Sequence, residues 1–184
     1  MRSTQELSEE HQAILQMIKV LEKMSERIET GHAVGPDDLE KSVEFLRVFA
    51  DKCHHGKEED CLFPEMEKVG VRREGSPIGV MLTEHVEGRK HVAAMATALQ
   101  GIRTGEAAAS SAFAAAARSY GALLTQHIFK EDHVLYPMAD ARFSEDQQRD
   151  LEARFADVEK RVIGPGKHEI FHRLLERLSA AYLA

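Results

Sequence analysis

One eleven-residue pattern occurs twice in this chain and constrains its fold more than any other feature. Residues 54–64 read HHGKEEDCLFP and residues 127–137 read HIFKEDHVLYP, so both follow HxxKE(E/D)xxL(F/Y)P without a gap. The similarity extends upstream, because Glu-His pairs at 10–11 and 84–85 precede the two copies by nearly the same distance. This duplication predicts two equivalent halves related by approximate two-fold symmetry.

The rest of the chain has the pattern of a row of helices. Apolar residues recur at helical spacing, and the alternating runs typical of strands are missing. We therefore predict an all-α fold in which four long antiparallel helices bury one shared interior. The expected helices cover about 3–29, 36–64 with a kink at Pro64, 77–103, and the stretch from Gly105 to about 140.

Two further helices are expected at about 144–162 and 167–182, packed on the outside of the bundle. The predicted division is a bundle domain at residues 1–142 and a C-terminal helical extension at 143–184, packed on the same domain.

The repeated histidines and glutamates predict a metal centre. Residues four apart in a helix share a face, so each HisxxxGlu pair presents an imidazole and a carboxylate to one point of the interior. Burying such groups without a metal would cost a few kcal/mol each, roughly, or shift their pKa values until they were neutral. Two divalent ions remove that cost. The predicted ligands are His11, His54, Glu58, His85, His127 and Glu131.

The donor types favour iron over other metals. Imidazoles with bridging carboxylates suit iron, with manganese and zinc as alternatives, and the chain has no thiolate set for a structural zinc site. Cys53 and Cys61 are eight residues apart in a helical stretch, about 12 Å, too far for a disulfide, so we expect reduced, buried thiols.

The first copy offers two pairings, His54 with Glu58 and His55 with Glu59. Alignment on the prolines places His54 opposite His127 and leaves His55 opposite Ile128, which favours the first pairing. We expect alanine at His54 or Glu131 to lower bound metal, and alanine at His55 or His168 to leave it unchanged. A solvated surface is the expected place of Glu59, Asp60, Asp132, His32 and His133.

A second metal site is less favoured. His168 and His172 are four residues apart, as in a metalloprotease helix, but the repeat does not include them and no third ligand is indicated.

Composition excludes several classes of function. The 184 residues carry a formal net charge of −7, which argues against a nucleic-acid surface. No apolar run is long enough for a membrane span and no secretory signal is recognisable, so we expect a soluble, cytoplasmic protein without a membrane partner. No separate output domain is recognisable, so a signalling partner would be a different chain, and a homo-oligomer stays open.

The blocks HHGKEEDCLFPEM, TEHVEGR and QHIFKEDHVLYPMAD resemble the hemerythrin-like family, known for its His-His-Glu cation-binding pattern, and the resemblance spans about residues 5–140. It implies a left-handed up-down-up-down bundle around an oxo- or hydroxo-bridged di-iron centre. Glu58 and Glu131 would bridge the two irons. The resemblance further implies that His11 and His54 serve one iron and His85 and His127 the other.

The chain departs from the oxygen-carrying hemerythrins in one respect. Those proteins have a HisxxxHis pair on the third helix, whereas Met81 and Arg89 stand four residues before and after His85. Six protein ligands leave more coordination positions for water or an exogenous ligand. Two glutamates and a hydroxide do not fully balance the charge of two ferrous ions, which leaves room for a seventh protein ligand. The candidates for that seventh ligand are Glu84, Glu87, Glu59 and His55.

The leading functional hypothesis is a non-haem di-iron protein that binds O2, NO or peroxide, or senses iron or redox state. The alternatives are a di-iron enzyme that decomposes peroxide, oxidises ferrous iron or reduces NO, and a scaffold in which metal only holds the helices together. Tyr120, seven residues before His127, is a candidate for lining the ligand pocket.

Overall fold

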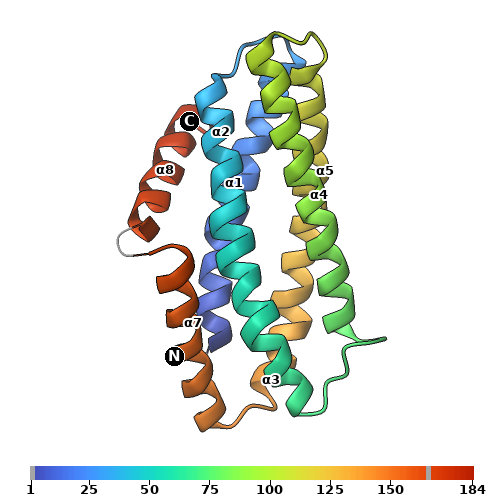
Figure 1. Ribbon diagram of the computed structural model, residues 1–184, viewed down its shortest axis with the longest axis vertical. Coiled ribbons are helices and arrows are strands. Elements are labelled where there is room, and N and C mark those ends of the chain that lie inside the picture. Colours follow the sequence, from blue (N-terminus) through green and yellow to red (C-terminus); the bar gives the residue numbers. More distant parts are fainter. Residues whose placement is uncertain (1–2, 165–166) are drawn as a thin grey trace.

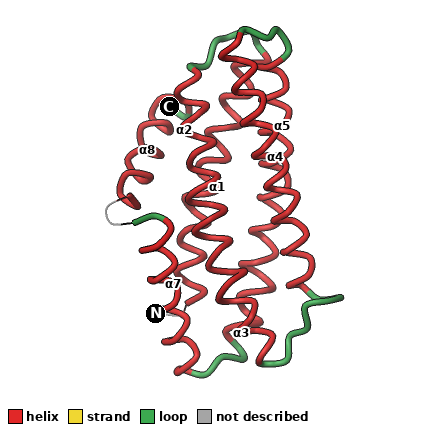
Figure 2. Tube along the Cα trace, viewed as in Figure 1, coloured by secondary structure: helices red, strands yellow, loops and turns green. Residues whose placement is uncertain are grey.

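The computed structural model describes residues 3–164 and 167–184, except for the side chains of 167 and 168. The described residues form helices joined by short loops and contain no strand (Figure 1 and Figure 2). The elements are α1 (Ser3–Glu29), α2 (Pro36–Phe45), η1 (Leu46–His55), η2 (Glu58–Leu62), α3 (Phe63–Lys68), α4 (Pro77–Thr104), α5 (Ala109–Lys130), η3 (Glu131–Leu135), α6 (Tyr136–Asp140), α7 (Glu145–Val162) and α8 (Lys167–Tyr182).

Four helical columns form the bundle predicted from the sequence. They are α1, the continuous run from α2 to α3, α4, and the run from α5 to α6, and they alternate in direction along the chain (Figure 1). α5 packs against both α4 and α1. The packing is close because α5 is rich in small residues: a Cβ at Gly121 would lie only 3.1 Å from the Ile18 side chain. The all-α, up-down-up-down prediction is confirmed.

Each copy of the repeated pattern contains a short π-helical segment that begins on a predicted glutamate ligand. These segments are η2 and η3. A proline follows each of them and has no N–H to donate, so the regular α-helical ladder is interrupted there. Instead, the Phe63 N–H donates to the Glu58 carbonyl and the Tyr136 N–H to the Glu131 carbonyl, which is the wider π-helical bond. The predicted break at Pro64 is therefore a local widening of a helix that continues.

The C-terminal helices cover one side of the bundle (Figure 1). α7 starts with a capping box between Ser144 and Gln147. Its apolar face adds Leu151 and Phe155 to one interior cluster, while α8 places Phe171 edge-on against Phe45 in the other. The extension thus shares the apolar interior of the bundle; the residue boundary at 142 stays a prediction.

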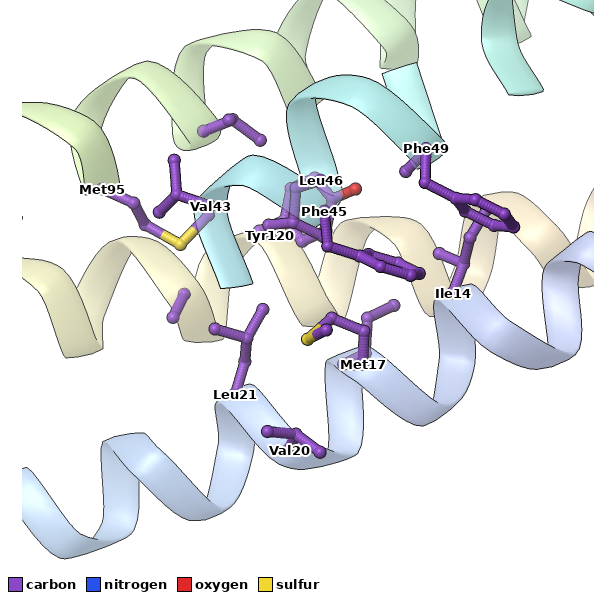
Figure 3. Packing of buried hydrophobic residues seen from close by; sticks show 14 of the residues in the cluster. Ile14, Met17, Val20, Leu21, Val43, Phe45, Leu46, Phe49, Met95 and Tyr120 are labelled. Atoms are coloured by element: carbon purple, nitrogen blue, oxygen red, sulfur yellow. The ribbon is translucent and has the colours of Figure 1, made fainter. Parts of the chain in front are cut away.

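The apolar interior consists of two clusters with the predicted ligands between them. The larger cluster contains Ile14, Phe49 and Leu124, and its packing is shown in Figure 3. The smaller one contains Leu7 and Leu135. Along α1, His11 lies between a residue of the smaller cluster and one of the larger cluster. Packed apolar side chains therefore cover the polar ligand layer from both directions along the bundle axis.

Both cysteines are free and buried, as predicted. No described helix is long and apolar enough to cross a bilayer.

Candidate metal centre

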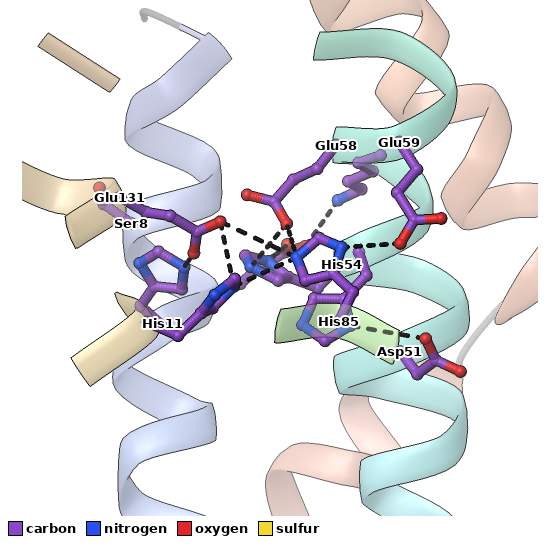
Figure 4. Close-up of polar contacts among 12 residues, drawn as sticks. Ser8, His11, Asp51, His54, Glu58, Glu59, His85 and Glu131 are labelled. Carbon is purple, nitrogen blue, oxygen red and sulfur yellow. Dashed lines mark hydrogen bonds and ion pairs between the residues drawn. The ribbon is translucent and has the colours of Figure 1, made fainter. Parts of the chain in front are cut away.

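The six predicted ligands lie together in the interior. All are at most 1% exposed, and they come from all four columns of the bundle. Figure 4 shows His11, His54, His85, Glu58 and Glu131 converging from different helices. Together with His55, these six residues form two overlapping groups of donor atoms, each compact enough to hold one metal ion. One group is His11, His54, Glu58 and Glu131, and the other is His55, Glu58, His85 and His127.

Both glutamates reach across the two groups. Glu58 Oε2 lies 3.3 Å from His85 Nε2 and 3.9 Å from His54 Nε2. Glu131 places Oε2 at 3.2 Å from His11 Nε2 and Oε1 at 3.1 Å from His127 Nε2. Two carboxylates shared between two sets of imidazoles are the arrangement required of bridging ligands.

The buried donors are short of partners in a way that a metal would correct. Among the described residues, the buried side-chain atoms without a hydrogen bond all belong to this cluster: both nitrogens of His55, Oε2 of Glu58 and both oxygens of Glu131. An unsatisfied buried polar group costs roughly 1–3 kcal/mol. Divalent cations would satisfy these atoms, so the residues present fit a two-metal centre in number, charge and chemistry.

Each of the four predicted histidines is oriented by a carboxylate on its outer nitrogen. The distance from the histidine Nδ1 to a carboxylate oxygen is 2.9 Å between His11 and Asp132, 2.8 Å between His54 and Glu10, 2.7 Å between His85 and Glu59, and 2.9 Å between His127 and Glu84. In a neutral, metal-bound ring these contacts would hold the proton on Nδ1 and turn the Nε2 lone pair toward the centre.

The orienting carboxylates repeat between the halves as the ligands do. Glu10 and Glu84 directly precede the upstream histidines of the two halves. Each contacts the histidine on the next column of its own half: Glu10 contacts His54, and Glu84 contacts His127. Glu59 and Asp132 directly follow the ligand glutamates. Each contacts the upstream histidine of the other half: Glu59 contacts His85, and Asp132 contacts His11. The two halves are therefore tied together at the centre by reciprocal contacts.

A lysine supports one carboxylate in each half. Lys57 is fully buried, and its Nζ donates to Glu10 Oε1 at 2.6 Å; Lys130 donates to Glu84. Burial alone would lower the pKa of Lys57, but the charges of Glu10 and its hydrogen bonds to Glu10 and Glu6 raise it, so the ammonium stays charged.

The surface prediction is correct for three residues and wrong for two. His32, His133 and Asp60 are exposed. Glu59 and Asp132 are only about a quarter exposed, at 26% and 23%, because each reaches inward to an imidazole. The signal that could have found them is in the duplication, since an acid follows the ligand glutamate in both copies.

Of the four candidates for a seventh ligand, the structure brings only His55 into a donor group. Its side chain is 3% exposed, and its ring stacks on that of His85 with centroids 3.9 Å apart. Glu59 and Glu84 instead bind Nδ1 atoms, and Glu87 pairs with Lys90. Proline alignment selected His54 correctly as the equivalent of His127 but gave no reason to place His55 inward as well.

Tyr136 is a site residue that the sequence reasoning missed. Its hydroxyl donates to Glu58 Oε1 at 2.7 Å and lies 3.3 Å from His11 Nε2, and its ring stacks on His11. In the other half the equivalent residue is Phe63, which stacks on His85 without a hydroxyl. The centre is thus asymmetric, because His55 of one half corresponds to Ile128 of the other, and Phe63 corresponds to Tyr136.

The imidazoles differ in their affinity for protons. Burial would lower the pKa of His11, but its hydrogen bond to Asp132 and the negative charge of the nearby Glu131 raise it to about 9. The charge of Glu131 overcomes burial at His127 and raises its pKa to about 10. At His54 burial dominates and lowers the pKa to about 3. Burial would raise the pKa of Glu131, but the neighbouring His127 and His11 hold it well below its usual range.

The less favoured site at 168 and 172 cannot be placed, because the His168 side chain lies outside the described residues. His172 is not part of either donor group found among the described residues.

The family model described as the Hemerythrin HHE cation binding domain matches residues 2–139. The chain belongs to this family. An uncharacterized protein of Mycobacterium bovis and two of Mycobacterium tuberculosis are each 23% identical over 160 residues, which covers 87% of this chain and 62% of theirs. The chain therefore spans less than two thirds of the length of these curated relatives. No solved structure was found to match it.

Proposed function

We propose that this protein holds two iron ions between its helices and binds O2, NO or peroxide there, or senses iron or redox state through that binding. The observation that carries the proposal is the pair of donor groups that share Glu58, with Glu131 also in reach of both. Four nitrogens oriented by carboxylates add to it, because such contacts raise the basicity of metal-bound imidazoles.

Iron is the metal that the donors favour, with manganese and zinc as alternatives. When bound, iron would supply reversible one-electron chemistry and coordination positions for a small ligand. The protein contributes a closed apolar environment on both sides of the layer, two carboxylates that span the ions, and a hydroxyl at Tyr136 that can hydrogen-bond inside the site. Two free, buried thiols are consistent with the reducing cytoplasm, where we place the protein.

Peroxide decomposition is the second candidate function. The observation that favours it is the buried Tyr136 hydroxyl beside Glu58 and His11, a proton donor of the kind that cleavage of an O–O bond requires. Conversion of two molecules of hydrogen peroxide into two of water and one of O2 needs no further reductant. The ferroxidase and NO-reduction alternatives require an external electron acceptor or donor.

Spectroscopy of anaerobically reduced, iron-loaded protein mixed with stoichiometric O2 tests the proposal. A stable charge-transfer band that disappears on removal of O2 supports binding or sensing. Rapid irreversible oxidation, with turnover of added peroxide, supports the enzyme instead. If the spectrum does not change and elemental analysis finds zinc, both redox functions are refuted and the metal only holds the helices together.

A further inference from the structure

His55 is held differently from the other four imidazoles of the centre. Those four each have a carboxylate oxygen within 2.9 Å of Nδ1. The nearest carboxylate oxygen to His55 Nδ1 is Asp51 Oδ1 at 3.5 Å, and neither ring nitrogen of His55 has a hydrogen bond within the described chain. A contact at that distance is too long to fix the orientation of a ring. His55 therefore lacks the outer support that stabilises the other candidate ligands.

Arg89 competes for the carboxylate that lies nearest to His55. Arg89 Nε donates to Asp51 Oδ1 at 2.7 Å, the same oxygen that faces His55, and a second guanidinium nitrogen donates to Glu59 at 2.8 Å. Arg89 is one of the two residues, with Met81, that stand four positions from His85, where a HisxxxHis pair would need its second histidine. In this chain Arg89 binds the carboxylate beside His55 and supplies no imidazole.

His55 also borders open space. A pocket of about 240 Å³ lies between η1 and α4, and His55 is the only described donor residue of the two groups that lines it. At about 30 Å³ per water molecule this volume holds roughly eight waters. Asp51, Arg89 and Tyr120 line the same pocket. Tyr120 is buried, with 2% of its surface exposed.

We propose that His55 is an exchangeable ligand: it completes the coordination of the metal held by His85 and His127, and moves into the pocket when a small exogenous ligand takes its place. The proposal rests on the proposed function, because it concerns the same centre. The exchange replaces one nitrogen–metal bond with one ligand–metal bond and changes neither the oxidation state nor the number of protons.

The pocket also indicates the class of ligand. Its lining includes two arginines, Arg47 and Arg89, and one carboxylate, Asp51, so the lining carries a net positive charge. The chain as a whole carries a net charge of −7. This electrostatic environment favours a small inorganic anion. Azide is a suitable probe because it is small, anionic and spectroscopically visible on iron.

The primary test compares azide binding to iron-loaded wild-type protein and to His55→Ala, followed by absorption titration and by the infrared stretch of bound azide. We expect His55→Ala to keep two irons per chain and to lower the azide Kd about tenfold, the change expected if the wild-type position is open about a tenth of the time. His55→Ile is a second variant, because Ile128 occupies the equivalent position in the other half. His54→Ala is the contrasting variant, which should lose metal.

A second comparison tests the part played by Arg89. Arg89→Gln releases Asp51 to hydrogen-bond His55, so azide should bind about three- to tenfold more weakly, the factor that one net hydrogen bond supplies. Arg47→Gln is the matched control, because it removes the same charge from the same pocket, whereas among the described residues the guanidinium paired with Asp51 is that of Arg89. The Arg89 variant should lose more affinity than this control.

The outcomes separate the two proposals. If His55→Ala and His55→Ile lose iron as His54→Ala does, His55 is a fixed ligand and the exchange is refuted. The same conclusion follows if they keep iron but bind azide with the wild-type Kd, or if Arg89→Gln and Arg47→Gln are equivalent. If wild-type protein holds no iron or binds neither azide nor O2, the proposed function itself fails.

Discussion

Glu59 and Asp60 are adjacent acids that the structure predicts to behave differently. Glu59 Oε1 lies 2.7 Å from His85 Nδ1, whereas Asp60 is exposed on the helix surface. Substituting either residue by alanine removes one negative charge from the same turn of η2, so Asp60→Ala measures the effect of losing a charge that contacts no imidazole. Only Glu59→Ala removes the support of a ligand.

The expected magnitude follows from this difference. Loss of an outer carboxylate on a metal-bound histidine weakens metal affinity about 10- to 100-fold, or roughly 1.4–2.7 kcal/mol. Part of the Glu59 side chain, 26%, is exposed, which places the expected effect toward the lower end of that interval. Asp60→Ala should change the affinity by less than about threefold, as expected of an exposed charge.

The assay is competition between the metal-free protein and a chelator of known affinity for ferrous iron, under anaerobic conditions. Circular dichroism of each metal-free variant serves as the control for folding. Equal losses in both variants, or an unchanged affinity in Glu59→Ala, would refute the conclusion that these carboxylates support the ligands.

Three further predictions follow from the same geometry. His54→Ala and Glu131→Ala should each lower the bound metal measured by elemental analysis; full loading of either variant would remove that residue from the ligand set. The raised pKa values of His11 and His127, about 9 and 10, mean that each holds a proton at neutral pH that a metal must displace. Apparent affinity should therefore rise with pH between about 6 and 8.5, by up to about tenfold per pH unit for each proton released, and a flat profile would contradict this. Tyr136→Phe removes a buried hydrogen bond to a carboxylate and should lower the unfolding free energy of the metal-free protein by roughly 1.5–3 kcal/mol. Urea titration measures this difference, and an unchanged unfolding free energy would show that the hydroxyl contributes nothing to stability.

The duplication predicted the bundle and brought out the six residues that the structure places in one layer, because residues at i and i+4 on a helix must share a face. It marks the acids that support the ligands, because they recur in both copies, but it could not predict their contacts with particular Nδ1 atoms. These join different columns, and two of the four join opposite halves, so they depend on how the helices pack and not on spacing along one helix.

His55 shows a second limit of reasoning from spacing. Neighbouring residues on an α-helix point about 100° apart, so one of two adjacent histidines would ordinarily face outward. Here π-helical η1 ends at His55 in the middle of the bundle, where His54 faces α1 and His55 stacks on α4. Adjacent imidazoles can therefore serve the two donor groups. The sequence suggests that either His54 or His55 faces the centre, whereas in the folded chain both do.

The count of metal ions per chain tests the central claim most directly. Protein reconstituted anaerobically with excess ferrous iron, desalted and measured by elemental analysis with Mössbauer spectroscopy should contain two irons per chain, magnetically coupled after oxidation. The two donor groups that share Glu58 require this result. A single iron per chain, or two irons without magnetic coupling, would contradict the account.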